Sequence, residues 1–330
     1  MKKIIALLLI LTSLCALVFS LGSCAPTDET EIRIGYMAGP TGIGMAKLIH
    51  DTKDTDSNLT FKKYADTTSA NNDLMNGNLD IACLPTNEAA KYFNSVNSDM
   101  QVLAINCLNS LSLLSNGQNS VDSIEDLNGK TIYTCKNGTP KLILAKLLEA
   151  YNIDATISHQ IGEGDTALTL NTPQDLPPVI VGNKADLIFA PEPMVSNALS
   201  KPVAKHEVVL DISGLWNEKF DTPIAMGCIV VSKSFAKEHP VAIENFLKEY
   251  KASIDYMADK ENNETAAEYV LEATIMTELA PAKSALLNLG SAISFVEGAE
   301  MKSTLVEIYK IFGMNVIGGK LPEDSFYYAK

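Results

Sequence analysis

Polar residues that could bind a small molecule occur where several predicted strands end and a helix follows. Thr41 follows the first strand, Thr86 and Asn87 follow an apolar strand, and Glu192 follows a later one. A helix that begins after a strand offers unpaired backbone N–H groups and a partial positive charge at the same place. These residues therefore predict a ligand-binding site that is built from strand ends and contains few charges.

The candidate binding residues come from four strand-end segments and two aromatic side chains. They are Tyr36, Gly39, Pro40, Thr41, Gly42, Pro85, Thr86, Asn87, Asn137, Gly138, Thr139, Glu192 and Trp216. Glycines in these segments allow a ligand to approach the backbone closely. Simpler roles are the alternatives: the glycine segments form tight turns, and Glu192 complements a helix N-terminus. For Trp216 the alternative to stacking on a ligand is packing in the core or at the hinge.

Reactive or metal-binding constellations are not predicted. The segment Gly39–Gly44 is not a phosphate loop, because Met45 stands where that loop has a lysine. After removal of the leader described below, the cysteines are Cys83, Cys107, Cys135 and Cys228, apart from Cys24. They are widely spaced without a CxxC pair, which argues against a metal site, and disulfides among them stay an alternative. The four histidines are scattered, so we expect no enzyme activity, no metal and no cofactor.

The composition is that of an acidic protein with a normal core. The formal net charge is −14 at pH 7, and 46% of the residues are hydrophobic. So acidic a surface argues against nucleic acid as a partner. Without its leader the chain has about 300 residues, which suits one large domain or two lobes.

The first 24 residues have the features of an export leader. Two lysines precede an apolar run over 4–19, and the run is followed by Leu21-Gly22-Ser23-Cys24. A charged start, an apolar run and a small-residue cleavage site are the three parts of a secretory signal. The last four residues resemble the lipobox of bacterial lipoproteins, which implies a diacylglycerol on Cys24. We expect a signal peptide over 1–23, a tether over 24–31, and a location on the outer face of the cell membrane. The alternative is a plain signal peptide or a signal anchor with an incidental cysteine.

Strand and helix patterns alternate along most of the chain. The predicted strands are 32–36, 59–64, 80–84, 130–135, 154–160, 186–190 and 228–231. The predicted helices are 44–51, 69–75, 86–93, 141–151, 192–199, 240–257, 265–274, 282–289 and 300–312. Such alternation predicts parallel α/β units. The segments 79–85 and 185–191 are similar, and each ends in proline before a helix, which indicates two related lobes.

An ordered set of short motifs supports a family resemblance. The motifs are Gly39–Gly42, Gly77–Ala82, Pro85–Asn87, Asp126–Ile132, Gly138–Pro140, Ala190–Pro193, Glu238–Pro240, Asn245–Tyr250, Leu321–Pro322 and Phe326–Tyr328. Together they resemble the substrate-binding proteins of bacterial ABC importers. The resemblance is to the group that binds nitrate, sulfonates, taurine and thiamine pyrimidines, and it runs from about residue 32 to the C-terminus.

The resemblance implies an α/β periplasmic-binding-protein-like fold of type II. Two lobes, each a mostly parallel sheet flanked by helices, would be joined by a two-segment hinge around a ligand cleft. We expect residues 32–116 and 222–330 to form the first lobe and 117–221 the second. Family members are monomers that bind a small molecule, close, and dock onto a membrane permease without chemistry. The alternatives are a sensor that reports its ligand to a membrane receptor, and an enzyme similar to a pyrimidine synthase, whose cysteine cluster this chain lacks.

The charges near the predicted strand ends favour a neutral ligand. Arg33 is the only arginine and lies inside the first strand, and Lys136 is the only cation among the strand-end segments. Planar recognition of anions usually recruits arginine. We expect a small, flat organic ligand such as a pyrimidine-like vitamin precursor, with Glu192 accepting a hydrogen bond from a ring amine and Thr86 or Asn87 fixing its orientation. A sulfonate or nitrate held by backbone N–H groups is the alternative.

Overall fold

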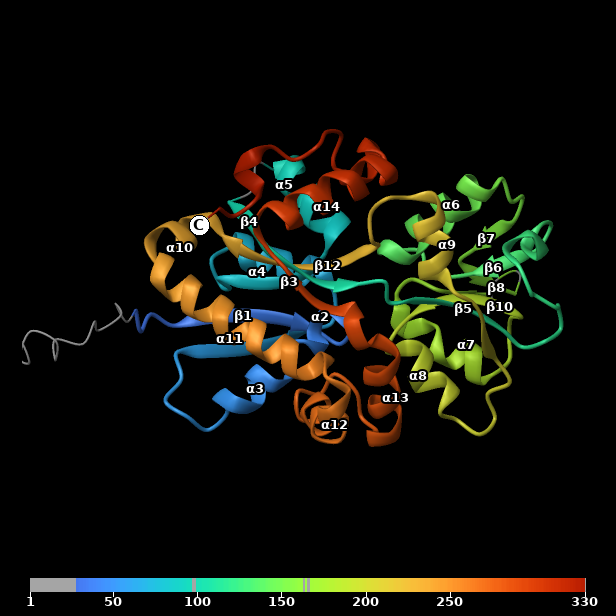
Figure 1. Ribbon diagram of the computed structural model, residues 1–330, viewed down its shortest axis with the longest axis horizontal. Helices are drawn as coiled ribbons and strands as arrows, with labels where there is room; N and C mark the ends of the chain where they lie inside the picture. Colours follow the sequence, from blue (N-terminus) through green and yellow to red (C-terminus); the bar gives the residue numbers. More distant parts are fainter. Residues whose placement is uncertain (1–27, 97–98, 163, 165–166, 330) are drawn as a thin grey trace, which may run out of the picture.

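The chain folds into two α/β lobes that lie side by side (Figure 1). The computed structural model describes residues 28–96, 99–162, 164 and 167–329. The predicted leader and Cys24 lie outside the described residues. Within the described part, no helix is long and apolar enough to cross a membrane.

The first lobe is built on a sheet with strand order β13-β4-β12-β3-β1-β2. Its strands are β1 (Ile32–Met37), β2 (Leu59–Tyr64), β3 (Ile81–Pro85), β4 (Met100–Leu108), β12 (Ala225–Ser232) and β13 (Ile293–Val296). Its α-helices are α2 (Pro40–Ile43), α3 (Ala46–Thr52), α4 (Thr67–Met75), α5 (Thr86–Val96), α10 (Lys233–Glu238), α11 (Pro240–Ala258), α12 (Asn263–Glu272), α13 (Leu279–Leu289) and α14 (Gly298–Phe312). Short 3-10 turns are η4 (Lys260–Asn262), η5 (Gly290–Ala292), η6 (Met314–Ile317) and η7 (Asp324–Phe326).

The second lobe is built on a sheet with strand order β11-β5-β10-β6-β7. Its strands are β5 (Leu111–Ser115), β6 (Thr131–Tyr133), β7 (Thr156–Ser158), β10 (Leu187–Pro191) and β11 (Glu207–Leu210), with a small ladder of β8 (Gln160–Ile161) and β9 (Leu168–Thr169) beside them. Its helices are η1 (Ile124–Leu127), α6 (Thr139–Tyr151), η3 (Pro173–Asp175), α7 (Pro177–Val181), α8 (Met194–Leu199) and α9 (Ile212–Lys219).

The expected two-lobed α/β fold is confirmed, and both sheets are mixed. Strand β1 pairs in parallel with β2 and β3, and β6 pairs in parallel with β7 and β10. The strands next to the hinge run the other way: β12 is antiparallel to β3 and β4, and β5 is antiparallel to β10. The sequence predicts mostly parallel sheets because strand-helix alternation carries no sign of these return strands.

Local sequence signals fix several helix starts near the expected positions. The Asp66 carboxylate accepts from the Ser69 backbone N–H at 2.8 Å and caps α4. Pro240 begins α11, where its fixed φ and missing N–H suit a first turn. The apolar run 81–84 of β3 is buried on both faces of the first sheet. These local rules account for the positions of the elements, and the pairing of the strands then decides the lobes.

The chain crosses between the lobes twice. It leaves the first sheet after Leu108 and enters β5 at Leu111, then returns between α9 and β12. The expected boundary at 116 assigns Leu111–Ser115 to the first lobe, whereas the structure pairs these residues with strands of the second sheet. The difference arises because β5 continues the apolar pattern of β4 after a short break, and only the strand pairing separates them.

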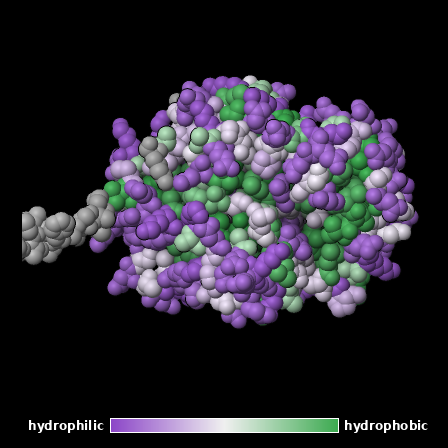
Figure 2. Space-filling view, viewed as in Figure 1, coloured by the Kyte–Doolittle hydropathy of each residue, from purple (hydrophilic) through white to green (hydrophobic). Residues whose placement is uncertain are grey.

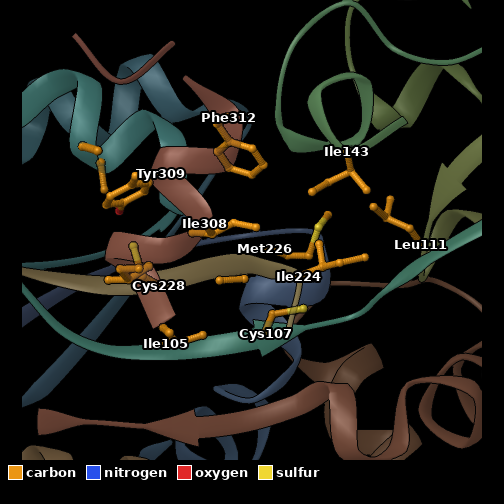
Figure 3. Packing of buried hydrophobic residues seen from close by; sticks show 14 of the residues in the cluster. Ile105, Cys107, Leu111, Ile143, Ile224, Met226, Cys228, Ile308, Tyr309 and Phe312 are labelled. Carbon is orange, nitrogen blue, oxygen red and sulfur yellow. The ribbon is translucent and has the colours of Figure 1, made fainter. Parts of the chain in front are cut away.

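One hydrophobic core runs through the hinge (Figure 3). Leu111 and Ile143 from the second lobe lie near Ile224 and Met226 at the return crossing and Phe312 of α14. The lobes are therefore joined on this side by apolar packing rather than by two bare chain segments. The four cysteines of the described chain, at positions 83, 107, 135 and 228, are buried free thiols.

Candidate ligand-binding cavity

A cavity of about 380 Å³ lies between the lobes. Its walls come from the carboxyl ends of β1, β2 and β3 in the first lobe and of β6 and β10 in the second. Ligands of parallel α/β proteins bind at such strand ends, and the volume lies in the range of small-molecule sites. The lining residues are Met37, Ala38, Gly39, Pro40, Thr41, Ala65, Asp66, Thr67, Thr68, Pro85, Glu88, Lys91, Tyr92, Asn137, Gly138, Thr139, Pro140, Thr172, Pro173, Gln174, Pro191, Glu192, Met194 and Met226.

The loop that follows β1 and lines the cavity is fixed in position by the buried side-chain amide of Asn106. The Asn106 side chain donates to the backbone carbonyl of Thr41 at 3.0 Å and to the Tyr250 hydroxyl at 3.0 Å. Gly227 lies directly under this loop, where an added Cβ would meet the Thr41 side chain at 2.1 Å. The close approach of β12 therefore requires glycine at position 227 and fixes the position of Thr41.

The second lobe presents the turn between β6 and α6. Gly138 has φ 88 and ψ −174, a conformation that favours glycine. The backbone N–H groups of Lys136 and Asn137 donate to the carbonyls of Leu170 and Asn171 at 2.7 and 3.1 Å. Thr139 is buried at the start of α6. This turn therefore brings an amide, a hydroxyl and the beginning of a 13-residue helix to the cavity.

Glu192 follows β10 and lies on the cavity wall while remaining almost fully buried. Its carboxylate accepts from the backbone N–H and the hydroxyl of Ser196 at 3.1 and 3.0 Å, and from the Asn288 amide at 2.9 Å. Burial raises the pKa of the carboxyl, and the bonds from Asn288 and Ser196 act in the opposite direction. The expected ring-amine acceptor is thus already engaged by protein donors.

The other charged groups on the wall also have partners within the protein. Asp66 accepts from the Ser69 N–H and hydroxyl, and these bonds hold the pKa of its carboxyl below its usual value. The Lys91 ammonium lies 3.9 Å from Glu88 on the same helix. The wall therefore carries three carboxylates and one ammonium among the described residues, so its ionisable side chains include more acids than bases.

Eight of the predicted site residues line the cavity. These are Gly39, Pro40, Thr41, Pro85, Asn137, Gly138, Thr139 and Glu192. The strand-end rule thus brings residues from both lobes to one place. Lys136, the only cation of the predicted strand-end segments, is not among the residues that line the cavity.

The remaining predicted residues are turned into the protein interior. Tyr36 donates its hydroxyl to the carbonyl of Ala273 at 2.9 Å, and Thr86 donates to the carbonyl of Ala225 at 2.7 Å. Gly42 packs against the backbone of Met37, where an added Cβ would lie 2.1 Å from its carbonyl oxygen. Packing against neighbouring elements, which the sequence does not show, directs these groups away from the cavity.

Asn87 and Trp216 also lie outside the lining. Asn87 is 4% exposed in α5. Trp216 has no exposed surface, because its ring packs on Phe220 at 4.2 Å and its Nε1 donates to the carbonyl of Thr222 at 2.8 Å. The structure therefore places Trp216 in the hinge core, the alternative considered from the sequence.

Sequence reasoning missed several lining residues. Ala65–Thr68 follow β2, so the strand-end rule that located the other loops would have found them. Met194 and Met226 gave no signal, because thioether side chains are common in cores. Gln174 of the second lobe donates to the carbonyl of Ala38 in the first at 3.1 Å. This bond closes one edge of the cavity and depends entirely on how the lobes meet.

Hydrophilic residues dominate the outer rim of the face shown in Figure 2, and apolar residues gather toward its centre and on the second lobe. No group of histidine, cysteine, aspartate and glutamate side chains that could hold a metal ion occurs in the part of the chain that the structure describes.

A comparison with protein-family models places this chain. The model described as menaquinone biosynthesis matches residues 48–289. The chain belongs to this menaquinone-biosynthesis family. No curated protein sequence matches it.

Solved structures with the same two-lobed architecture are similar to this family member. An ABC transporter protein from Parabacteroides distasonis has a TM-score of 0.74 at 19% identity, covering 91% of this chain and 99% of its own. The aliphatic sulphonate binding protein SsuA from Escherichia coli has a TM-score of 0.70 at 15% identity, with 92% and 93% covered. The nitrate-binding protein NrtA from Synechocystis PCC 6803 has a TM-score of 0.59 at 14% identity, with 83% and 75% covered. The resemblance to the sulfonate- and nitrate-binding group is thus confirmed at the level of the fold.

Proposed function

We propose that the protein is a solute-binding protein of an ABC importer, which captures a small organic molecule between its lobes and delivers it to a membrane permease. The observation that carries this proposal is the cavity of about 380 Å³ whose walls come from both lobes. A solute in such a site contacts both lobes at once, so binding favours the closed arrangement. The fold shared with sulfonate- and nitrate-binding proteins supports the same reading.

Binding without chemistry is supported by the groups on the wall. The lining among the described residues includes neither histidine nor cysteine. Its carboxylates at positions 66 and 192 accept hydrogen bonds from protein donors, and that of Glu88 lies 3.9 Å from the Lys91 ammonium. A general acid or base needs a free, positioned proton-transfer group. The family description favours a second candidate, a biosynthetic enzyme. Incubation of the protein with each bound solute, followed by mass spectrometry, separates the two, because only an enzyme converts the solute.

We further propose that the solute is uncharged. Three carboxylates and one lysine surround the cavity, and the lysine faces a carboxylate at 3.9 Å. The only arginine, Arg33, is paired with Asp80 at 2.7 Å. Negative walls repel anions, while methionine and proline side chains provide apolar contacts for a ring. Thr139 and Asn137 then offer neutral hydrogen-bonding groups at one end.

A thermal-shift screen tests both the binding function and the ligand class. Because only the folded state binds the solute, a free solute concentration of about 100 times Kd should stabilise the protein by about 2.7 kcal/mol. We expect shifts with uncharged pyrimidines and thiamine fragments and none with nitrate or sulfonates. If sulfonates alone shift the melting temperature, the proposal of an uncharged ligand is wrong and the ligand is an anion. The proposed import function is not affected by that result. If no small molecule shifts the transition and none binds by calorimetry, the binding function itself fails.

The site can be probed with variants of its neutral groups. Thr139→Val removes a hydroxyl at nearly constant volume, and a lost hydrogen bond to a neutral ligand should lower affinity about 5- to 10-fold. Thr86→Val serves as the matched control, because its hydroxyl bonds to Ala225 inside the lobe. It should change stability rather than affinity. Equal effects of the two variants on affinity would argue against contact between Thr139 and the solute.

We also propose that Cys24 carries a lipid that anchors the protein to the outer face of the cell membrane. The leader pattern that ends in Leu21-Gly22-Ser23-Cys24 supports this proposal. A single anchor would keep the protein near its permease. The expected tether over 24–31 is shortened to the residues before Asp28, because Asp28 and Thr30 contact His239 of the first lobe at 3.1 and 3.2 Å. A Cys24→Ala variant should be released or left unprocessed. A variant that stays membrane-bound at the mature size would contradict lipid anchoring.

A further inference from the structure

Glu192 is a buried carboxylate whose donors in the structure are neutral groups. Its Oε2 accepts from the Ser196 N–H at 3.1 Å, and its Oε1 accepts from the Ser196 hydroxyl at 3.0 Å and the Asn288 amide at 2.9 Å. Burial of a carboxylate is costly unless hydrogen bonds replace its lost water. These three bonds are therefore what allows Glu192 to remain at 4% exposure.

The donors belong to different lobes. Ser196 lies on α8 in the second lobe, and Asn288 lies on α13 in the first. Asn288 also donates to the Ser196 hydroxyl at 3.1 Å. Helices α8 and α13 pack against each other where the lobes meet (Figure 1). We call Glu192, Ser196 and Asn288 the interlobe joint, because separating the lobes must remove Asn288 from the other two residues.

The joint differs in chemistry from the hinge side. There Ile143 and Leu111 of the second lobe pack with Met226 of the first, and all three are buried (Figure 3). Exposing such apolar groups to water is unfavourable throughout the separation. When the lobes separate, the polar groups of the joint can instead replace their hydrogen bonds to each other with hydrogen bonds to water, at a small net change in free energy. The joint is therefore the side at which the lobes can part.

We propose that Asn288 is a positioning residue that holds the closed arrangement and makes it respond to the contents of the cavity. Glu192 is part of the cavity wall, so a solute beside it covers the 4% of the residue that is still exposed and removes the last water from the carboxylate. A hydrogen bond to a charged group strengthens as the local dielectric constant falls. A bound solute thus strengthens the bond from Asn288 without touching Asn288, and this last step alone rests on the proposed function.

Small-angle X-ray scattering of the protein without solute tests the joint. Asn288→Ala should raise the radius of gyration by roughly 1 Å above the ~19 Å expected for a closed chain of this size. Asn263→Ala is the matched control. The Asn263 side-chain amide donates at 3.0 Å to the carbonyl of Lys283, which lies on the same helix as Asn288. This hydrogen bond stays within the first lobe. The control variant should leave the radius unchanged. An unchanged radius for Asn288→Ala, with circular dichroism showing a folded protein, would overturn the proposal.

An Asn288→Asp variant gives a signature that a merely structural role would not produce. It places a second carboxylate against Glu192, and two carboxylates this close cannot both be ionised. We expect an enlarged radius of gyration at alkaline pH, and recovery of the closed radius as the pH falls and the two carboxyl groups share a proton. Charged groups on and next to the two helices are already paired, Lys201 with Glu278 and Lys283 with Glu264. A radius that does not depend on pH in this variant would contradict the joint.

Discussion

Asn109 and Ile224 tie together the two chain segments that cross between the lobes. The Asn109 N–H donates to the carbonyl of Ile224 at 3.0 Å, and the Ile224 N–H donates to the Asn109 side-chain oxygen at 3.0 Å. Asn109 has φ 43, a left-handed conformation that asparagine adopts more readily than most residues. The two crossing segments are therefore fixed to each other at the hinge.

Asn109→Ala should destabilise the protein by about 2–3 kcal/mol, because it leaves the N–H of Ile224 unpaired and puts alanine in a strained conformation. Asn109→Gly is the control, since glycine tolerates the positive φ and loses only the side-chain acceptor. Its cost should be about 1–2 kcal/mol. Urea unfolding measures both, and wild-type stability in both variants would show that the pair does not hold the hinge.

Gly227→Ala should destabilise the protein by about 1–3 kcal/mol, since overpacking forces neighbouring atoms to move. The added methyl would meet Thr41 at 2.1 Å and the Asn106 oxygen at 2.7 Å. Because Thr41 lines the cavity, solute affinity should fall as well. Gly39→Ala is the control for stability, because an added Cβ there meets no atom within 4 Å. Thermal unfolding of the two variants checks the prediction, which fails if their transitions coincide.

Trp216→Phe should lower stability by about 1–3 kcal/mol through the unpaired carbonyl that it leaves. That carbonyl belongs to Thr222, at 2.8 Å from the indole nitrogen. Solute affinity should stay within about twofold of the wild-type value, since Trp216 is not among the residues that line the cavity. Calorimetry with any solute found in the screen provides the measurement. Lost affinity at unchanged stability would favour stacking of Trp216 on the ligand.

Glu192 should make stability depend on pH in an unusual direction. Burial raises its folded-state pKa above the ordinary value of 4.5, so folding favours the protonated form. Its contribution is therefore fully present below pH 4.5 and is lost as pH rises through the raised folded-state pKa. Relative to Glu192→Gln, which stays neutral, the wild type should lose stability over that range. A difference in melting temperature between the two proteins that stays constant with pH would contradict this assignment.

The buried cysteines should resist alkylation in the folded protein. Burial raises the pKa of Cys83, Cys107 and Cys135 to about 12 and that of Cys228 also well above its usual value. The thiolate is the reactive form, so iodoacetamide at neutral pH should modify these four only after unfolding. Peptide mass spectrometry with and without urea measures this. Rapid modification of one cysteine without denaturant would identify a local opening.

The sequence alone determined the features that follow from local rules. The run 81–84 reads as a strand because four consecutive apolar residues need burial on both faces, and Pro240 marks a helix start through its own ring. Eight of the candidate residues reached the cavity because parallel strands present their carboxyl ends at one edge of a sheet. The turn at Gly138 also follows from a local rule, since its backbone conformation favours glycine.

Only the tertiary structure decided which side chains face the cavity and how the lobes meet. Strand β13 was hidden among helical patterns, because a four-residue strand owes its existence to pairing with β4, far away in the sequence. The rings of Tyr36 and Trp216 turn inward to partners supplied by other elements. Glu192 and Asn288 lie 96 positions apart, and their contact exists only because two lobes close on each other. Such contacts depend on non-local packing, which no local pattern of residues encodes.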